Sequence, residues 1–235
     1  MLAKRIIPTM LVRGRTLVKG ERFNSWRSIG HALQSAKIHA ARGVDELCIL
    51  DISATAEGRG PDLDLVRELS EGCFIPITVG GGVRSLEHID QLLRAGADKV
   101  CIGVGYWNDP TLITKASERF GKQAIVTSLD VGPHMGCAQD YAFRLEMLGA
   151  GEILLQAIDR DGTLQGYDLD LIRAVSASVS IPVIASGGCG SYEHMLEAFK
   201  AGADACAAGA MFAFTDNTPR GAARFLKSQG LEVRL

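Results

Sequence analysis

Residues 75–103 read IPITVGGGVRSLEHIDQLLRAGADKVCIG, and residues 181–209 read IPVIASGGCGSYEHMLEAFKAGADACAAG. The two stretches align without a gap at a shift of 106 positions, sharing Ile-Pro, Gly-Gly, Ser-x-Glu-His and Ala-Gly-Ala-Asp. The same shift places Glu46 on Glu152, and residues 62–65 on residues 168–171, which both read DLDL. A repeat of this length indicates that one structural unit occurs twice in the chain.

The beginning of the chain follows a different offset. Residues 6–12 align with residues 125–131 at a shift of 119 positions, so the first copy carries 13 additional residues after its first strand. We expect these residues to form an extra loop.

Each copy alternates short apolar runs with amphipathic segments. Segments such as 85–95 and 191–201 begin at Ser and end at Ala-Gly, as capped helices do. The apolar runs predict eight strands, which the intervening helices make parallel: 5–12, 46–51, 75–80, 99–103, 124–130, 152–157, 182–186 and 205–209.

Eight such units in 235 residues predict a (β/α)₈ TIM barrel. We expect a single domain over residues 1–235, built from half-barrels of about 1–120 and 121–235. A doubly wound open sheet is the alternative, which the repeat disfavours because two half-barrels close naturally into one barrel.

The composition excludes several classes of protein. The net charge is −2, which argues against nonspecific nucleic-acid binding, and no apolar run approaches the ~18–20 residues of a membrane helix. The N-terminus lacks a signal peptide, and the six cysteines form no CxxC pair. We therefore expect a cytoplasmic protein with reduced thiols, no metal and no cofactor, in which His88 and His194 are helix-surface residues.

Glycines follow the strands that correspond in the two copies. In a barrel of this class the chemistry occurs at the carboxyl ends of the strands, where backbone N–H groups and helix N-termini bind phosphate. Glycines at strand ends also occur in ordinary tight turns. Because the glycine-rich ends fall at corresponding positions in the two copies, they instead predict two phosphate sites and a bisphosphate ligand. The residues concerned are Gly81, Gly82 and Gly103 in the first copy, and Ser186, Gly187, Gly188, Gly209 and Ala210 in the second.

Carboxylates also follow the strands. Asp51 and Asp130 end two strands, and Asp159 and Asp161 lie in the run DRDGT with Gly162. Such residues serve either in acid–base chemistry or as turn and cap residues. Lys19, in the expected extra loop, is positioned either to close over a phosphate or to remain solvated.

The opposite strand ends carry Arg5, Glu46, Lys99 and Glu152. Two cations and two anions on one barrel floor are expected to form a closed ring of salt bridges. Stabilisation is the commoner role of this face.

Ten runs carry a resemblance that covers the whole chain: MLAKRIIP (1–8), LVKG (17–20), DEL (45–47), LDI (50–52), VGGG (79–82), LRAGADKV (93–100), GAGEILL (149–155), DRDGT (159–163), GYD (166–168) and IASGG (184–188). Together these runs resemble the HisF family, the cyclase subunits of imidazole glycerol phosphate synthase. The resemblance implies a partner, the glutaminase HisH, whose ammonia passes up the barrel to a ribulosyl bisphosphate substrate.

The resemblance also implies roles for individual residues. Arg5, Glu46, Lys99 and Glu152 match the family's ammonia gate, and Asp98 matches a residue at the glutaminase interface. Asp130 matches the second of two catalytic aspartates. The substrate-contacting positions match Lys19, Asp51, Gly82, Asp161, Ser186 and Gly188.

Four departures from the family accompany these matches. The first catalytic aspartate belongs in a Cys-Leu-Asp-Val run, where this chain reads TMLV and has Leu11. Gly103-Val104 replaces an Asn-Thr pair of the family, and Gln156-Ala157 replaces a Thr-Ser pair. The segment after the fifth predicted strand (124–130) is about 15 residues shorter than in the family. HisF-like proteins with Leu at this position occur in surface-polysaccharide pathways that form amidino sugars.

Three functions fit this pattern. The first is a divergent HisF-like subunit that delivers glutamine-derived ammonia to another phosphorylated acceptor. The second is a histidine-pathway cyclase that tolerates Leu11, and the third is a non-catalytic scaffold.

Overall fold

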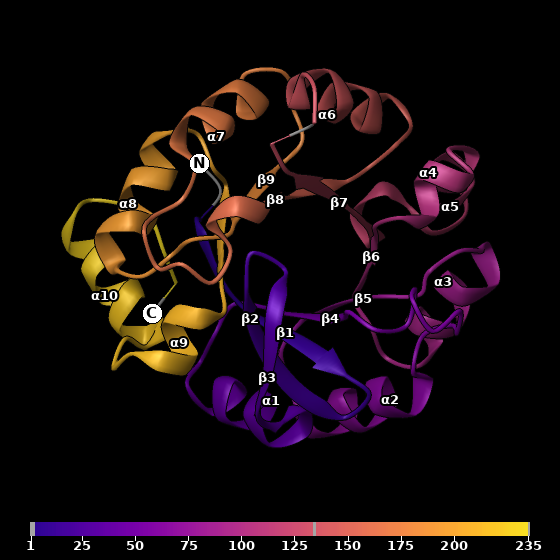
Figure 1. Ribbon diagram of the computed structural model, residues 1–235, viewed down its shortest axis with the longest axis horizontal. Helices are drawn as coiled ribbons and strands as arrows, with labels where there is room; N and C mark the ends of the chain where they lie inside the picture. Colours follow the sequence, from indigo (N-terminus) through magenta and orange to yellow (C-terminus); the bar gives the residue numbers. More distant parts are fainter. Residues whose placement is uncertain (1–2, 134, 235) are drawn as a thin grey trace.

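The computed structural model describes residues 3–133 and 135–234; His134 and the Met1-Leu2 start of the first family-like run lie outside the described residues. Its centre is a ring of parallel strands surrounded by helices (Figure 1). The ring strands are β1 (Arg5–Arg13), β4 (Leu47–Asp51), β5 (Ile77–Gly80), β6 (Lys99–Ile102), β7 (Ile125–Val131), β8 (Glu152–Ala157), β9 (Val183–Ser186) and β10 (Ala205–Ala208).

The sheet closes because β1 pairs in parallel with both β4 and β10, in which Arg5 lies opposite Ala205. This closure confirms the eight-stranded (β/α)₈ barrel and excludes the open doubly wound sheet. The strands are apolar on both faces because one face packs in the barrel lumen and the other against the helices.

The helices cover the outside of the ring (Figure 1). They are α1 (Ala32–Ala41), α2 (Leu63–Gly72), α3 (Leu86–Arg94), α4 (Gly105–Asn108), α5 (Thr111–Phe120), α6 (Ala138–Met147), α7 (Leu169–Ser176), α8 (Tyr192–Lys200), α9 (Ala210–Phe214) and α10 (Pro219–Ser228). None of the described helices is long and apolar enough to cross a membrane.

The repeat predicted corresponding helix starts, and the structure places the same capping contacts there. Ser85 and Ser191 accept a hydrogen bond from the backbone N–H three residues later, as do Asp62 and Asp168. Each cap satisfies a donor that the first helical turn leaves free.

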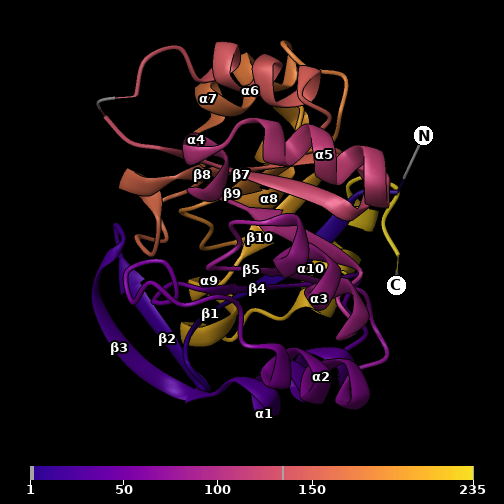
Figure 2. The same ribbon diagram turned by 90° about the vertical axis from the view of Figure 1, so that its right-hand side faces the viewer.

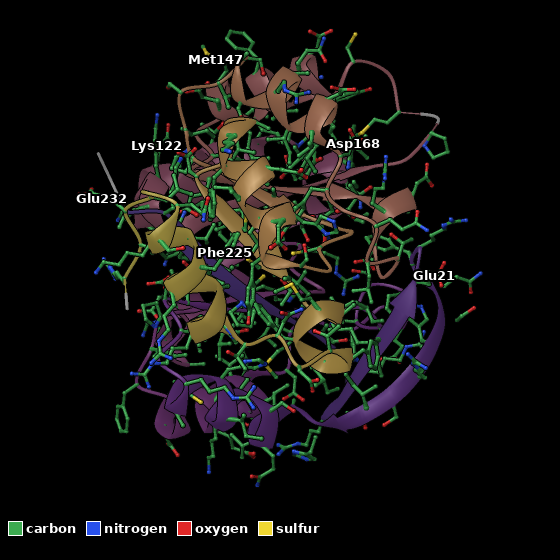
Figure 3. All side chains as sticks on the ribbon, turned by 90° about the vertical axis from the view of Figure 1, so that its left-hand side faces the viewer. Glu21, Lys122, Met147, Asp168, Phe225 and Glu232 are labelled. Carbon is green, nitrogen blue, oxygen red and sulfur yellow. The ribbon has the colours of Figure 1, made fainter. Side chains whose placement is uncertain are left out.

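The prediction of an extra loop after the first strand was wrong. Residues 13–31 form an antiparallel hairpin of β2 (Thr16–Glu21) and β3 (Asn24–His31), which extends the sheet beyond β1. Leu17 and Val18 bury their side chains and so hold β2 against the barrel. In Figure 2 the hairpin stands on the side opposite both termini, which places it over the carboxyl ends of the ring strands. Figure 3 shows the same separation, with Glu21 of the hairpin on the side away from Glu232.

Candidate functional site

The carboxyl ends of the strands surround a cavity of about 350 Å³. This mouth cavity contains five residues that the sequence predicted, namely Asp51, Gly81, Gly82, Gly103 and Asp130. The wall also includes Arg84 from the loop before α3, together with Phe23 and Trp26 from the hairpin region. The first predicted phosphate site therefore opens into the same cavity as Asp130.

A second, narrow hollow of about 20 Å³ lies at the ends of β9 and β10. It brings together the other predicted residues of the mouth: Lys19, Asp161, Gly162, Ser186, Gly187, Gly188, Gly209 and Ala210. Leu11 and Gln156 line both this hollow and the mouth cavity. The two glycine-lined cradles are thus separated by a shared wall.

The glycines after β5 and β9 are required by close backbone contacts. Gly187 has φ +97°, and a Cβ there would lie 2.5 Å from the carbonyl oxygen of Ala157. Gly81, its counterpart in the repeat, has φ +107° and would collide with the carbonyl of Asp51. Only glycine fits both the conformation and the space.

Both cradles expose backbone donors. Within residues 3–133 and 135–234, the N–H groups of Gly82 and Val83 donate to no protein acceptor, and those of Gly188 and Cys189 behave in the same way. Backbone donors near a buried surface normally have a partner. Free N–H groups just before a helix, in a hollow lined by glycine, suit an anion such as phosphate.

His88 and His194 support these loops. His88 Nδ1 accepts the N–H of Arg84 at 3.3 Å, and His194 Nδ1 accepts the N–H of Gly190 at 3.1 Å. Both side chains are half-buried on their helices, so these histidines lie at the helix surface, as the sequence predicted, but they also contact the preceding loop. Each imidazole connects the first turn of its helix to the glycine-rich loop before it.

Lys19 lies on β2 rather than in a loop, and its side chain is buried beside the second cradle. The ammonium Nζ donates to the carbonyl oxygen of Thr9 at 3.0 Å, directly beside Gly209, where no Cβ would fit. Burial lowers the pKa of Lys19 to about 8, although the nearby carboxylate of Asp161 opposes the change. Burial raises the pKa of the Asp161 carboxyl, and the nearby ammonium of Lys19 opposes that rise. A buried ammonium in an anion-sized hollow is a strong phosphate ligand.

Asp51 combines a turn role with its place in the mouth. Its Oδ1 accepts the backbone N–H groups of Ser53 and Ala54 at 3.0 and 3.2 Å. Its Oδ2 pairs with the Arg59 guanidinium at 2.7 Å. Asp51 is therefore held rigidly, with its charge already matched by an arginine.

Asp130 belongs to a hydrogen-bonded network of three strands. Its Oδ1 accepts from the Ser128 hydroxyl at 2.6 Å and from Gln156 Nε2 at 3.2 Å. Gln156 Oε1 in turn accepts from the Ser186 hydroxyl at 3.1 Å. The network runs from the second cradle, through the shared wall, to the carboxylate in the mouth cavity.

The floor of the barrel holds a closed ring of ion pairs. Arg5 contacts Glu46 at 2.9 Å and Glu152 at 3.0 Å, and Lys99 contacts the same two carboxylates at 3.0 and 2.9 Å. Burial opposes the charge on Arg5, but Glu152 and Glu46 outweigh it and raise the pKa of the guanidinium. This closed ring was predicted from the position of the four residues at the first positions of their strands.

Comparisons with known proteins agree with this architecture. Residues 5–218 match the family described as "Histidine biosynthesis protein". The chain is 43% identical to "Imidazole glycerol phosphate synthase subunit HisF" of Pelodictyon phaeoclathratiforme over the full length of both proteins. It is 44% identical, again over full length, to the subunits of the same name from Chlorobaculum parvum and Chlorobium phaeobacteroides.

The chain belongs to the HisF family. The alignments extend over 251 positions, whereas this HisF-family chain has 235 residues, so its relatives carry about 16 positions that it lacks. The sequence predicts a deficit of about this size in the segment after β7, and the location of the missing positions stays a prediction.

Leu11 stands at the centre of this HisF-family mouth. Its side chain is 6% exposed and belongs to the apolar cluster inside the barrel, with Leu50 and Val18. It lines both cradles and carries no group that transfers a proton. Asp130 is therefore faced across the mouth by an apolar side chain.

Asp98 lies at the start of β6, on the floor side of this HisF-family barrel. Its Oδ2 accepts the backbone N–H of Ile77 at 2.8 Å, and the residue is exposed. Asp204, its counterpart in the repeat, accepts the N–H of Val183 at 3.1 Å. Both aspartates cap the beginning of a neighbouring strand.

Sequence reasoning missed three contributors to the mouth. Ser128 and Arg59 hold Asp130 and Asp51, and Gln156 joins the two cradles. The position of Gln156, at the end of a strand and two residues after the inward-facing Leu154, was an available signal.

Proposed function

We propose that this chain is the synthase subunit of a glutamine amidotransferase. A HisH-like glutaminase docks on the floor, and its ammonia passes through the barrel to a phosphorylated substrate at the mouth. One observation carries the proposal: an ion-pair ring at one end of an apolar lumen and two glycine-lined anion cradles at the other.

The lumen suits neutral ammonia. Above the ring, most inward-facing side chains are apolar or thiol groups: Ile7, Cys48, Cys101, Val126, Leu154, Ile184, Ala205 and Ala207. Burial raises the pKa of the Cys101 thiol to about 12, which keeps it uncharged. An ammonium ion entering this column would lose its hydration without a counter-charge, whereas ammonia would lose far less.

The ring is the entrance that ammonia must pass. Lys99 has a flexible four-carbon stem and makes two hydrogen bonds to the carboxylates of the ring, whereas Arg5 makes three, so Lys99 is the member best able to swing aside. Glu46 is held more firmly, because it also accepts a hydrogen bond from Thr78 at 2.5 Å. We propose that docking of the glutaminase displaces Lys99 while Arg5, Glu46 and Glu152 stay paired.

The cradles support a phosphorylated, bisphosphate substrate. Lys19 and the free N–H groups of Gly188 and Cys189 bind one phosphate, and those of Gly82 and Val83 bind the other. Phosphates fixed at both ends leave the middle of the substrate over Asp130 and Leu11, directly above the lumen.

Asp130 is the acid–base group of this site. Addition of ammonia to an electrophilic carbon requires that the new nitrogen lose a proton, which Asp130 accepts on the side-chain oxygen facing the cavity. A cyclisation that needs a second positioned carboxylate would lose ~10²–10⁴ in rate without it. We therefore propose a different acceptor from the ribulosyl substrate, such as the precursor of an amidino sugar in a surface-polysaccharide pathway.

A second candidate is the cyclase reaction of imidazole glycerol phosphate synthase itself. The observation that favours it is the 43–44% identity over the full length of three proteins named as its HisF subunit.

Reconstitution with a HisH-type glutaminase tests the proposal. The purified chain should stimulate glutamine hydrolysis by that partner, with further stimulation when a bisphosphate occupies the mouth. An Asp98→Lys variant, changed on the floor only, should lose the stimulation but keep its phosphate affinity. Failure to bind or activate any glutaminase of this type would overturn the proposal.

A further inference from the structure

We propose that Gln156 determines the specificity of this mouth: its carboxamide and the Asp130 carboxylate together bind a hydroxyl group carried between the two phosphates of a sugar bisphosphate. The inference rests on the proposed function, since it needs a substrate that spans both cradles. It goes further by naming the chemical group that the centre of the site selects.

The orientation of the Gln156 amide follows from the chemistry of its neighbours. An ionised carboxylate only accepts hydrogen bonds, so the nitrogen of Gln156 must face Asp130, at 3.2 Å. The amide oxygen then faces Ser186, whose hydroxyl donates to it at 3.1 Å. Gln156 is 8% exposed and is held at both ends, so its amide cannot turn without breaking one of these contacts.

The network leaves a defined pair of free positions. Ser128 and Gln156 both donate to Oδ1 of Asp130, and Oδ2 receives no donor from the described residues. One hydrogen of the Gln156 amide nitrogen is also uncommitted, since the nitrogen has two and makes one contact. The mouth therefore presents one donor beside one acceptor.

A hydroxyl group matches this pair, because it accepts from the amide and donates to the carboxylate at the same time. A methylene matches neither, and a bound bisphosphate that covers the mouth would then remove the exposed Asp130 carboxylate and the buried Gln156 amide from water without giving them partners. A third phosphate or a carboxylate would accept from Gln156 but would face Asp130 with a like charge. Leu11 gives the opposite wall an apolar surface that suits the carbon chain.

Calorimetric titration with two probes tests the inference. The probes are D-ribulose 1,5-bisphosphate and pentane-1,5-diyl bisphosphate, which share the chain length and the phosphates but differ in the oxygens between them. Wild-type protein should bind the sugar bisphosphate at least about tenfold more tightly, because a site built to hydrogen-bond a hydroxyl penalises its absence.

The Gln156→Met variant keeps the side-chain length but removes both hydrogen-bonding atoms. It should lose most of this discrimination and bind the two bisphosphates with nearly equal affinity. Gln156→Asn, whose amide is too short to reach both partners, provides a second test if the methionine variant folds poorly. Gln91→Met, on the outer face of α3, is the matched control and should discriminate like the wild type.

The outcomes separate this inference from the proposed function. Wild-type protein that binds neither bisphosphate would overturn both. Wild-type protein that binds the two equally, or a Gln156 variant that still discriminates, would overturn only the role of Gln156.

Discussion

The ion-pair ring should make a large contribution to the free energy of unfolding, and Glu46→Gln tests it. Glu46 is 3% exposed and accepts from Arg5, Lys99 and Thr78. The substitution keeps the shape of the side chain but removes its charge, so both cations must share Glu152. Breaking a buried ion pair by removing one partner costs about 3–5 kcal/mol.

The expected loss is smaller than that range. Arg5 and Lys99 remain 21% and 17% exposed, so water compensates part of their charge, and glutamine still accepts from Thr78. We expect a loss of about 2–3 kcal/mol, which lowers the Tm of a chain of this size by about 4–12 °C. Urea titration followed by circular dichroism measures the free energy, and a thermal scan measures the Tm.

A surface pair provides the control. Arg15 and Glu68 lie 2.7 Å apart, but their side chains are 44% and 40% exposed. An exposed pair contributes about 0–1 kcal/mol, so Glu68→Gln should change stability by less than half as much as Glu46→Gln. Equal losses in the two variants would refute the claim that the ring is a buried, mutually dependent unit.

Three further predictions follow from the site and the core. Burial lowers the pKa of Lys19 to about 8, so the affinity of the protein for inorganic phosphate should fall as the pH rises above 8. The Lys19→Met variant should bind phosphate weakly at every pH. Calorimetric titration measures both affinities, and a wild-type affinity that does not change with pH would contradict this prediction. Burial lowers the pKa of His39 from 6.5 to about 4, so the unfolded chain binds more protons than the native one between those values, and stability should fall as the pH drops from 6.5 to 4. His39→Phe should flatten that decline in urea titrations, and an unchanged slope would argue against it. Gly187→Ala should abolish phosphate binding at the second cradle and destabilise the fold by about 1–3 kcal/mol, while near-normal binding would show that the backbone there can move.

The repeat made most of the barrel predictable. A stretch that recurs with its caps, such as Ser85 and Ser191, specifies both strand and helix boundaries, and the predicted strand 152–157 matches β8 at both ends. The ion-pair ring on the floor was predictable because the first residues of all the strands meet on one face of a barrel, regardless of the conformation of the loops.

The hairpin was not predictable by the same reasoning, because it has no counterpart in the second half. The buried residues of β2 are Leu17, Val18 and Lys19, three consecutive positions that lack the alternation by which a strand is identified. Lys19 was consequently placed in a loop, although its ammonium is buried in the second cradle.

Contacts between strands account for the other omissions. The roles of Gln156, Ser128 and Arg59 depend on which side chains are in contact at the mouth. The spacing of these residues in the sequence does not reveal those contacts. His88 and His194 were assigned to the helix surface because they fall on equivalent helices and show no metal-ligand spacing. Their contacts with backbone N–H groups of the preceding loop cannot be read from that pattern.

We propose that the mouth keeps two phosphate cradles and a route for ammonia but carries out its chemistry with Asp130 as the one acid–base carboxylate. The most direct test is turnover of the ribulosyl substrate of imidazole glycerol phosphate synthase with ammonium salts, comparing wild type, Leu11→Asp and Asp130→Asn. We expect wild-type protein to bind the substrate but to form imidazole glycerol phosphate at least ~10²-fold more slowly than Leu11→Asp. Wild-type turnover that Leu11→Asp does not increase and Asp130→Asn abolishes would contradict it.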